Sequence, residues 1–541
     1  MESESSVLRD FTVDSRVWLL SAVALIIGIG ATFLAVLLLR LIALSTNLFY
    51  YHRFSLEFAS PAGSTLGYWM VIVPVIGGLI VGLMARFGSD KIRGHGTPEA
   101  IEAILLHRAR IDPKIAILKP ISAAIAIGSG GPFGAEGPII MTGGAFGSLI
   151  AQWFHLTDVE RTTLLVAGAA AGMSATFATP VAAILLAVEL LLFELRPRSV
   201  VPVAIASATA AILRGYLLGA GPLFRMPGIG NVDRIPFAAG SVLLGVVVGL
   251  IAAGLSRMMY AFEDFFESSP VHWMWWPALG GIGVGVGGLF FPRGLGVGYD
   301  NIAELLHGSA PIALILGILL AKSLMWAFSL GSGTSGGVLA PLLMIGGAVG
   351  AAAGRLSHAP SEMQAFWALI GMGSMLAGSL GVPLTAILFS LEVTHCLPAL
   401  VPLTLGCIAS YLLTALIMPR SILTEKLSRR GYHLTREYGV DPLEIVIVRD
   451  LMTPISTPIN SVEKAVVPEF FVYADCTCRS AAELMATEGI ARLPVVNRTT
   501  QRINGTITLQ DLLKGRSRAV VRENERLRLV SQLDNASGER N

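Results

Sequence analysis

The chain has 541 residues, of which 53% are hydrophobic and 14% are charged, and its mean hydropathy is +0.68. Average soluble domains carry about 25% charged residues, so this composition excludes an ordinary soluble protein and indicates several spans in a lipid bilayer. The formal net charge of +2 gives no reason to expect nucleic acid as a partner, and the four cysteines do not suggest a disulfide framework.

The first part of the chain predicts a short tail followed by two membrane spans. Residues 1–16 are polar and are expected to form the tail, whereas Val17–Tyr51 and Leu66–Met84 are apolar and long enough to cross a bilayer. The region from Arg86 to Lys119 contains seven Lys and Arg residues. By the positive-inside rule this region is cytoplasmic, and the N-terminus, two spans earlier, is expected on the same side.

The basic region contains the segment GHGTPEAIEAILLHR, which runs from Gly94 to Arg108. The Gly-x-Gly turn, followed by Pro98, predicts the start of an amphipathic helix. His95 lies in this turn and has two open interpretations, either a side chain in a functional site or a histidine satisfied by local backbone. The second half of the chain has a weaker echo, GVGYDNIAELLH, with Val297 in the place of His95.

The stretch Gly128–Gly147, GSGGPFGAEGPIIMTGGAFG, is rich in glycine and carries one charged residue, Glu136. Glycine lets a backbone approach a ligand closely, and Pro138 suits the first turn of a helix. Free N–H groups at a helix start, together with the positive end of the helix dipole, form an anion site. A carboxylate there can occupy the site itself or move aside for another anion, so the stretch predicts a gated anion site.

A second copy of this stretch, GSGTSGGVLAPLLMIGGAVG, lies 203 residues further along the chain, the distance between Pro138 and Pro341. At this offset ten of the twenty positions are identical, but Glu136 is matched by Leu339. Two similar halves with Gly/Pro-broken segments at corresponding positions point to a transport site at the repeat interface. The alternative, a glycine-rich motif for helix packing, explains isolated small residues but not this register.

The remaining apolar segments are mostly too short for a full span and are separated by glycine or proline. They are 115–128, 138–151, 162–177, 180–195 and 200–218 in the first half, and 237–259, 277–291, 312–329, 341–354, 365–380, 382–394 and 397–418 in the second. Broken helices at membrane depth are tolerated only where they are buried in protein or line a cavity. We therefore predict an all-α polytopic membrane protein whose two repeats, 17–218 and 236–430, are joined by 219–235.

The composition becomes charged after the last apolar segment, which marks the exit from the membrane. We expect a linker at 431–444 and a cytoplasmic domain at 445–541. An amphipathic stretch at 478–489 and two β-rich runs followed by a helix predict a small α/β unit. Cys476 and Cys478 lack a second cysteine pair or a histidine cluster, so no metal site is expected.

Three motifs in this order, GHGTP at 94–98, GAEGP at 134–138 and GGVLAP at 336–341, resemble those of the CLC family of chloride channels and chloride/proton exchangers. The resemblance covers roughly residues 17–430. It implies inverted-topology repeats of tilted, broken helices in a homodimer with one anion pathway per subunit. It also implies chloride as the transported ligand. The tail resembles CBS domains, which usually occur in pairs.

The resemblance also assigns roles to residues of the pathway. Glu136 takes the position of the gating glutamate. The positions expected around the anion are Gly94, His95, Gly96, Ala135, Gly137, Val338, Leu339 and Leu423. Two of these depart from the family pattern, because His95 replaces a serine and Leu423 falls where a tyrosine is expected, which leaves the selectivity among anions open.

Proton-coupled members of the family often carry a second glutamate, and its position here falls at Leu190, directly after Glu189. Glu189 has a repeat partner, Glu392, which favours a structural role for both, whereas Glu194 is a conceivable substitute on a proton path. We therefore favour a voltage- or pH-gated chloride channel over a chloride/proton antiporter, which remains the alternative.

The CBS-like tail is also incomplete by the family pattern, since the first CBS unit is mostly missing. Thr508 and Asp511 match the T-x-x-D spacing that holds a nucleotide ribose in complete modules. A fold-stabilising or dimer-contact role is favoured over an adenine-nucleotide sensor. The membrane half contains no HExxH, GxSxG or Walker lysine motif, so we expect neither an enzyme nor a cofactor. The short tails and the absence of targeting signals suggest a bacterial inner membrane, with both termini cytoplasmic.

Overall fold

The computed structural model describes residues 15–230, 232, 235–431, 443, 446–454 and 470–516. The chain forms two compact units, one of residues 11–436 and one of residues 437–541 together with 1–10. The predicted tail of residues 1–16 and the predicted linker of 431–444 lie largely outside the described residues.

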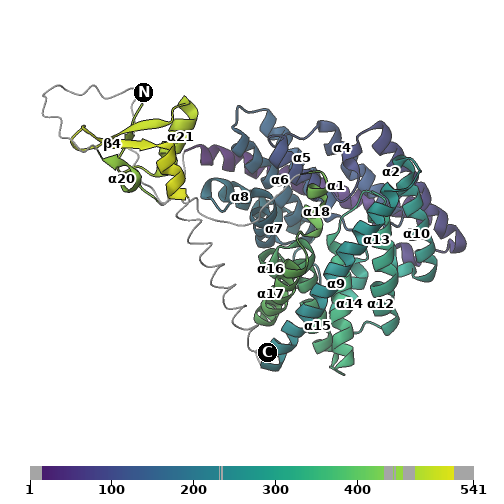
Figure 1. The fold of residues 1–541 in the computed structure, drawn as a ribbon. Helices are drawn as coiled ribbons and strands as arrows, with labels where there is room; N and C mark the ends of the chain where they lie inside the picture. The colour runs from purple at the N-terminus through teal and green to yellow at the C-terminus, as the bar shows by residue number, and fades with distance from the viewer. Residues whose placement is uncertain are drawn as a thin grey trace. The chain divides into compact units, whose positions relative to one another are not determined.

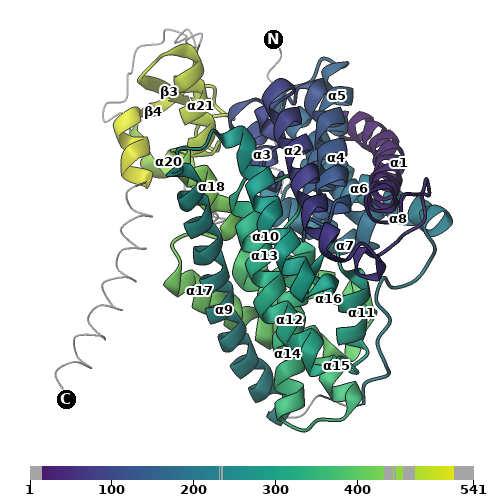
Figure 2. The ribbon, with the colours of Figure 1, turned by 90° about the vertical axis from the view of Figure 1, so that its right-hand side faces the viewer.

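The larger unit is built from helices, which Figures 1 and 2 show packed against one another. Within the described residues, eight helical segments are long and apolar enough to cross a membrane. The helices are α1 (Arg16–Tyr51), α2 (Ile72–Phe87), α3 (Thr97–Leu106), α4 (Pro113–Gly128), α5 (Glu136–Gln152), α6 (Asp158–Phe177), α7 (Pro180–Leu186), α8 (Pro197–Leu217), α9 (Ile235–Glu267), α10 (Trp276–Phe290), α11 (Tyr299–Leu306), α12 (Ile312–Gly317), α13 (Ser323–Gly331), α14 (Leu339–Leu356), α15 (Ser361–Leu380), α16 (Pro383–Thr394), α17 (Leu400–Ile417) and α18 (Ile422–Arg429).

The predicted all-α membrane architecture is confirmed, with two differences in its helices. The segment predicted at 180–195 is α-helical only to Leu186 and continues as a π-helix, Ala187–Leu192, which ends where Phe193 adopts a positive φ of 53°. The segment predicted at 312–329 is interrupted by a second π-helix, Ile318–Lys322. Hydrophobicity alone does not distinguish a π-helix from an α-helix, so neither π-helix could be predicted from the sequence.

The repeat is preserved in the packing of two helix pairs, α5 with α6 and α14 with α15. A Cβ atom at Gly143 would lie 2.3 Å from the carbonyl oxygen of Gly168, and one at Gly346 would lie 2.4 Å from that of Gly371. The two contacts are related by the same 203-residue offset. Each pair therefore needs glycine for its backbones to approach closely, as small residues allow between membrane helices.

Two carboxylates tie α7 to α16 reciprocally. Glu189, in the π-helix after α7, accepts hydrogen bonds from the N–H groups of Leu384 and Thr385 at 3.2 and 2.8 Å, in the first turn of α16. Glu392, near the end of α16, accepts bonds from two N–H groups in the first turn of α7 at 2.9 and 2.8 Å. Each carboxylate thus satisfies N–H groups that have no partner within their own helix. This geometry supports the structural interpretation of both glutamates.

The smaller unit has a four-stranded sheet in the order β1-β4-β3-β2, with β2 and β3 parallel and the other neighbours antiparallel. Its elements are α20 (Val448–Leu451), β1 (Thr453–Pro454), β2 (Val472–Tyr473), α21 (Cys478–Glu488), β3 (Arg492–Val496), β4 (Ile503–Thr508) and a helical segment at 509–516. The α/β prediction is confirmed, but β1 and β2 were missed because two residues are too few to show alternation.

The reciprocal capping predicts a cost in stability when one carboxylate is removed. We expect Glu392→Ala to lower the melting temperature of the detergent-solubilised protein, because two N–H groups of α7 lose their acceptor at a cost of about 1–2 kcal/mol. The matched control is Glu57→Ala, since the Glu57 side chain is exposed in the loop after α1. Equal melting temperatures for the two variants would contradict the capping role.

Candidate anion site

The two glycine-rich motifs meet at a short antiparallel bridge between the repeats. The N–H of Gly134 donates to the carbonyl of Gly337 at 3.1 Å, and the N–H of Gly337 donates to the carbonyl of Gly134 at 2.9 Å. Helix α5 begins two residues after one glycine, and α14 begins two residues after the other. The bridge therefore brings the N-termini of two repeat-related helices together.

The side chain of Glu136, the first residue of α5, is held at the start of α14. Glu136 is 3% exposed, and its Oε1 atom accepts hydrogen bonds from the N–H of Leu339 and, at 3.3 Å, from the N–H of Ala340. Its Oε2 atom is buried without a hydrogen-bond partner in the described part of the chain. The first-turn N–H groups of α14 thus already have an acceptor, which is the carboxyl group of this side chain.

Glycine is required on both sides of this carboxylate. A Cβ atom at Gly134 would lie 1.8 Å from Oε2 of Glu136, and one at Gly337 would lie 2.5 Å from Oε1. A Cβ atom at Gly137 would meet the carbonyl oxygen of His95 at 1.9 Å. The glycines of the motif therefore make room for the carboxylate and for the close approach of the turn that contains His95.

A cavity of about 20 Å³ lies beside Glu136 and collects residues from both repeats. Its lining residues are Thr97, Glu136, Gly137, Ile140, Met173, Leu186, Leu190, Val338, Leu339, Leu380 and Leu423. Five residues predicted to bind or gate the anion are among them, and so is Leu190 of the predicted proton path. Apart from Glu136, the side chain of Thr97 is the only polar one among these lining residues.

The turn before α3 packs behind the cavity. His95 is buried but is not among the lining residues, and its Nδ1 atom has no hydrogen-bond partner among the residues described. The buried ammonium of Lys119 donates to the carbonyls of Ile92 and Gly94, both at 2.8 Å, and so fixes the turn. Lys322, at the same 203-residue offset, is also buried and donates to the carbonyl of Gly296 at 2.7 Å.

Neither lysine was predicted as a structural residue of the site. The sequence does indicate both, because Lys119 and Lys322 are charged residues next to or inside apolar segments and are separated by the repeat offset. Helix α18, which carries Leu423, is held to α3 by ion pairs from Lys426 and Arg430 to Glu99 at 3.0 and 3.2 Å. These contacts place Leu423 in the wall of the cavity.

Comparison with known proteins identifies the family. A family model described as Voltage gated chloride channel matches residues 76–415, and a CBS domain model matches residues 448–518. The chain belongs to the voltage-gated chloride channel (CLC) family. It is therefore a multi-pass membrane protein of a family that transports anions.

Individual relatives include proteins named as channels and as exchangers. The chain is 29% identical over 370 residues to the voltage-gated ClC-type chloride channel ClcB of Escherichia coli (strain SMS-3-5 / SECEC), covering 67% of this chain and 88% of that protein. It is 27% identical over 390 residues to the H(+)/Cl(-) exchange transporter ClcA of Citrobacter koseri, covering 68% and 80%. The crystal structure of a slow cyanobacterial Cl-/H+ antiporter shares its fold with a TM-score of 0.65 at 22% identity, covering 77% of this chain and 99% of that one.

The three residues of the predicted proton path are not gathered at one place in this CLC-family chain. Leu190 lines the cavity beside Glu136, whereas Glu189 caps α16. Glu194 accepts a hydrogen bond from the hydroxyl of Ser199 and lies 3.5 and 3.6 Å from two arginines, Arg196 and Arg198. Neither glutamate is among the residues that line the cavity.

In the CBS unit, Thr508 and Asp511 bond to each other at the start of a helix. The Thr508 N–H and hydroxyl donate to Oδ2 of Asp511 at 3.1 and 2.6 Å, and the Asp511 N–H donates back to the hydroxyl at 3.3 Å. The hydrogen bond from the hydroxyl holds the pKa of the Asp511 carboxyl below its usual value. This is the geometry of a helix cap, and it supports the fold-stabilising interpretation.

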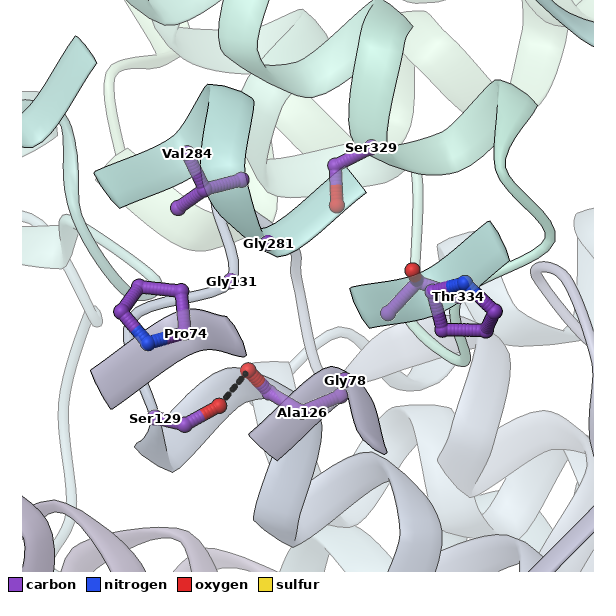
Figure 3. A pocket seen from close by; sticks show the side chains of 10 residues that line it. Pro74, Gly78, Ala126, Ser129, Gly131, Gly281, Val284, Ser329 and Thr334 are labelled. Atoms are coloured by element: carbon purple, nitrogen blue, oxygen red, sulfur yellow. Dashed lines mark hydrogen bonds between the residues drawn. The ribbon is translucent and has the colours of Figure 1, made fainter. Parts of the chain in front are cut away.

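A second cavity, of about 10 Å³, contains none of the candidate site residues and lies between the repeats (Figure 3). Its lining includes Pro74 and Gly78 from α2 and their repeat partners Pro277 and Gly281 from α10. This volume is close to the lower limit for one water molecule. Within the described ranges, no group of three His, Cys, Asp or Glu side chains is arranged to hold a metal ion.

The packing around Glu136 predicts the effect of a single methyl group. In Gly134→Ala the three nearest atoms to the new Cβ all belong to the Glu136 side chain, so the carboxylate has to leave its place on α14. We expect this variant to weaken pH-dependent gating in an anion-flux assay. Combining it with Glu136→Ala should have no further effect beyond that of Glu136→Ala, because the clashing atoms are then absent. Wild-type gating in Gly134→Ala would contradict this arrangement.

Proposed function

We propose that this protein conducts chloride across the membrane as a CLC-type channel gated by Glu136. One observation carries the proposal, namely that the Glu136 carboxylate occupies the N–H groups of Leu339 and Ala340. A carboxylate and a chloride ion carry the same charge and use the same kind of donor, so they compete for one site. When the carboxylate leaves, the amide groups of α14 become available to the transported anion.

The proposed gate responds to pH through the charge of Glu136. The ionised carboxylate is attracted to the positive end of the α14 dipole, whereas the neutral acid largely loses this attraction. As pH falls, the fraction of neutral acid rises, and chloride then meets a weaker competitor. Flux is therefore expected to increase on acidification.

Conduction without proton coupling is supported by the walls of the cavity. Leu190 falls where proton-coupled members of the family often carry a glutamate, and Leu423 falls where the family pattern has a tyrosine. Both add apolar side chains to the wall beside Glu136. The carboxylates of Glu189 and Glu194 are engaged by backbone N–H groups and by arginines outside the lining. An antiporter remains the alternative, since relatives named as H(+)/Cl(-) exchange transporters are also similar to this chain.

We further infer that two copies of the chain form a homodimer, each copy with its own pathway. The basic region 86–119 supports a cytoplasmic location for that face and for both termini. We place the protein in a bacterial inner membrane.

Reversal potentials of the purified protein in lipid bilayers test whether it conducts chloride as a channel or exchanges chloride for protons. Under a chloride gradient, a channel gives a potential that follows chloride alone, and an added proton gradient does not move it. A shift with the proton gradient would overturn the channel in favour of the antiporter. Absence of any chloride current would overturn anion transport itself.

Neutralising the gate predicts the loss of its pH response. In Glu136→Gln the side chain keeps nearly the same size but carries no charge, so chloride flux should become independent of pH at a level at or above that of the unmodified protein. The measurement is chloride efflux from liposomes between pH 4.5 and 7.5, with Glu57→Gln as the matched control. A wild-type pH response in Glu136→Gln would refute the gate.

A further inference from the structure

Thr97 and Tyr299 occupy equivalent positions in the two repeats. Thr97 is the first residue of α3 and follows G-H-G, and Tyr299 is the first residue of α11 and follows G-V-G. The glycine before each has a positive φ, 89° at Gly96 and 78° at Gly298. A buried lysine donates a hydrogen bond to a carbonyl of each turn. Both hydroxyl-bearing side chains therefore follow the same kind of lysine-fixed turn. In Figure 2, α3 lies closer to the top of the larger unit than α11 does.

The hydroxyl of Thr97 is available to a ligand in the cavity beside Glu136. Thr97 lines that cavity and is 5% exposed. Within the described ranges, its hydroxyl makes no hydrogen bond. An anion in an apolar cavity needs donors to replace its lost water, and Thr97 supplies one.

The hydroxyl of Tyr299 is buried without a hydrogen-bond partner in the part of the chain that the structure describes. Its ring is held edge-on by Phe177 and Phe224, with centroids at 6.4 and 6.1 Å. The turn that carries Tyr299 packs on α14, the helix that holds the Glu136 side chain, since a Cβ atom at Gly298 would lie 3.0 Å from the sulfur of Met344. The Oε2 atom of Glu136 is likewise buried without a partner among the described residues. A buried donor and a buried acceptor beside the same helix, both unsatisfied, are unusual in a native structure.

We propose that Thr97 and Tyr299 are the two side-chain donors of the anion pathway, one from each repeat. The Thr97 hydroxyl donates to the anion in the cavity, and the Tyr299 hydroxyl donates to the Glu136 carboxylate when it leaves α14. The carboxylate then exchanges backbone donors for a hydroxyl donor and does not become an unpaired buried charge. This assignment rests on the proposed role of Glu136 as a gate, and it names the residues that receive the anion and the displaced carboxylate.

Bromide binding tests the role of Thr97. We expect Thr97→Val, made in the Glu136→Gln protein so that the gate does not compete, to weaken bromide affinity roughly tenfold or more in titration calorimetry. Thr97→Ser keeps the hydroxyl and should retain the affinity. The control is Thr142→Val, which removes a buried hydroxyl that donates to the Pro138 carbonyl at 2.7 Å. If Thr97→Val does not fold, Thr97→Ala takes its place, and unchanged affinity would overturn the assignment.

Chloride flux tests the role of Tyr299, because Tyr299→Phe removes only the hydroxyl oxygen. We expect flux at acidic and neutral pH to fall several-fold in the otherwise unmodified protein, and to be unaffected when Glu136 is replaced by alanine. The control is Tyr50→Phe, whose lost hydroxyl donates to the Ser129 carbonyl at 3.0 Å. An equal fall in both backgrounds, or no fall in either, would overturn the assignment.

The outcomes also separate this inference from the proposed function. If the unmodified protein carries no chloride, the proposed function fails first. If it carries chloride and Glu136→Gln abolishes its pH response, while the Thr97 and Tyr299 variants behave like their controls, only the two hydroxyl assignments fail.

Discussion

The carboxylate of Glu136 lies on the first-turn N–H groups of α14, and the surrounding structure is arranged to allow this contact. A buried carboxylate is stable only where donors replace its water, and here backbone amides and a helix dipole provide them. The contact needs a backbone without side chains on either side, which explains Gly134 and Gly337. It also needs two helix starts side by side, which the bridge between these glycines supplies.

Most of this geometry occurs in both repeats, but the buried glutamate occurs in only one of them. The lysine-fixed turns, the reciprocal glutamate caps and the glycine contacts between helices all occur in both halves. The halves differ where Glu136 is matched by Leu339. One repeat therefore contributes the carboxylate and the other contributes the amides that hold it. The candidate anion site lies at the interface of two similar halves. It is asymmetric because Glu136 in one half is matched by Leu339 in the other.

Much of the membrane fold could be predicted because apolar segments, glycine clusters and the 203-residue offset are properties of the chain itself. The position of Glu136 at a helix start followed from Pro138 and the glycines around it. The direction of individual side chains did not follow. Whether His95 or Thr97 lines the cavity depends on the turn at Gly96, where a positive φ decides which residue faces inward. Tyr299 was missed because the echo GVGYDNIAELLH shows that the turn recurs but not which way the side chain after it points.

In the proposed mechanism, a transported anion and the Glu136 carboxylate use the same amides of α14. Anomalous diffraction from crystals soaked in bromide, of the unmodified protein and of Glu136→Gln, would show which of the two occupies them. We expect bromide at the N–H groups of Leu339 and Ala340 in the variant, and the carboxylate in that place in the unmodified protein near neutral pH. Bromide bound there while the carboxylate keeps its position, or bromide absent from that place in the variant, would contradict it.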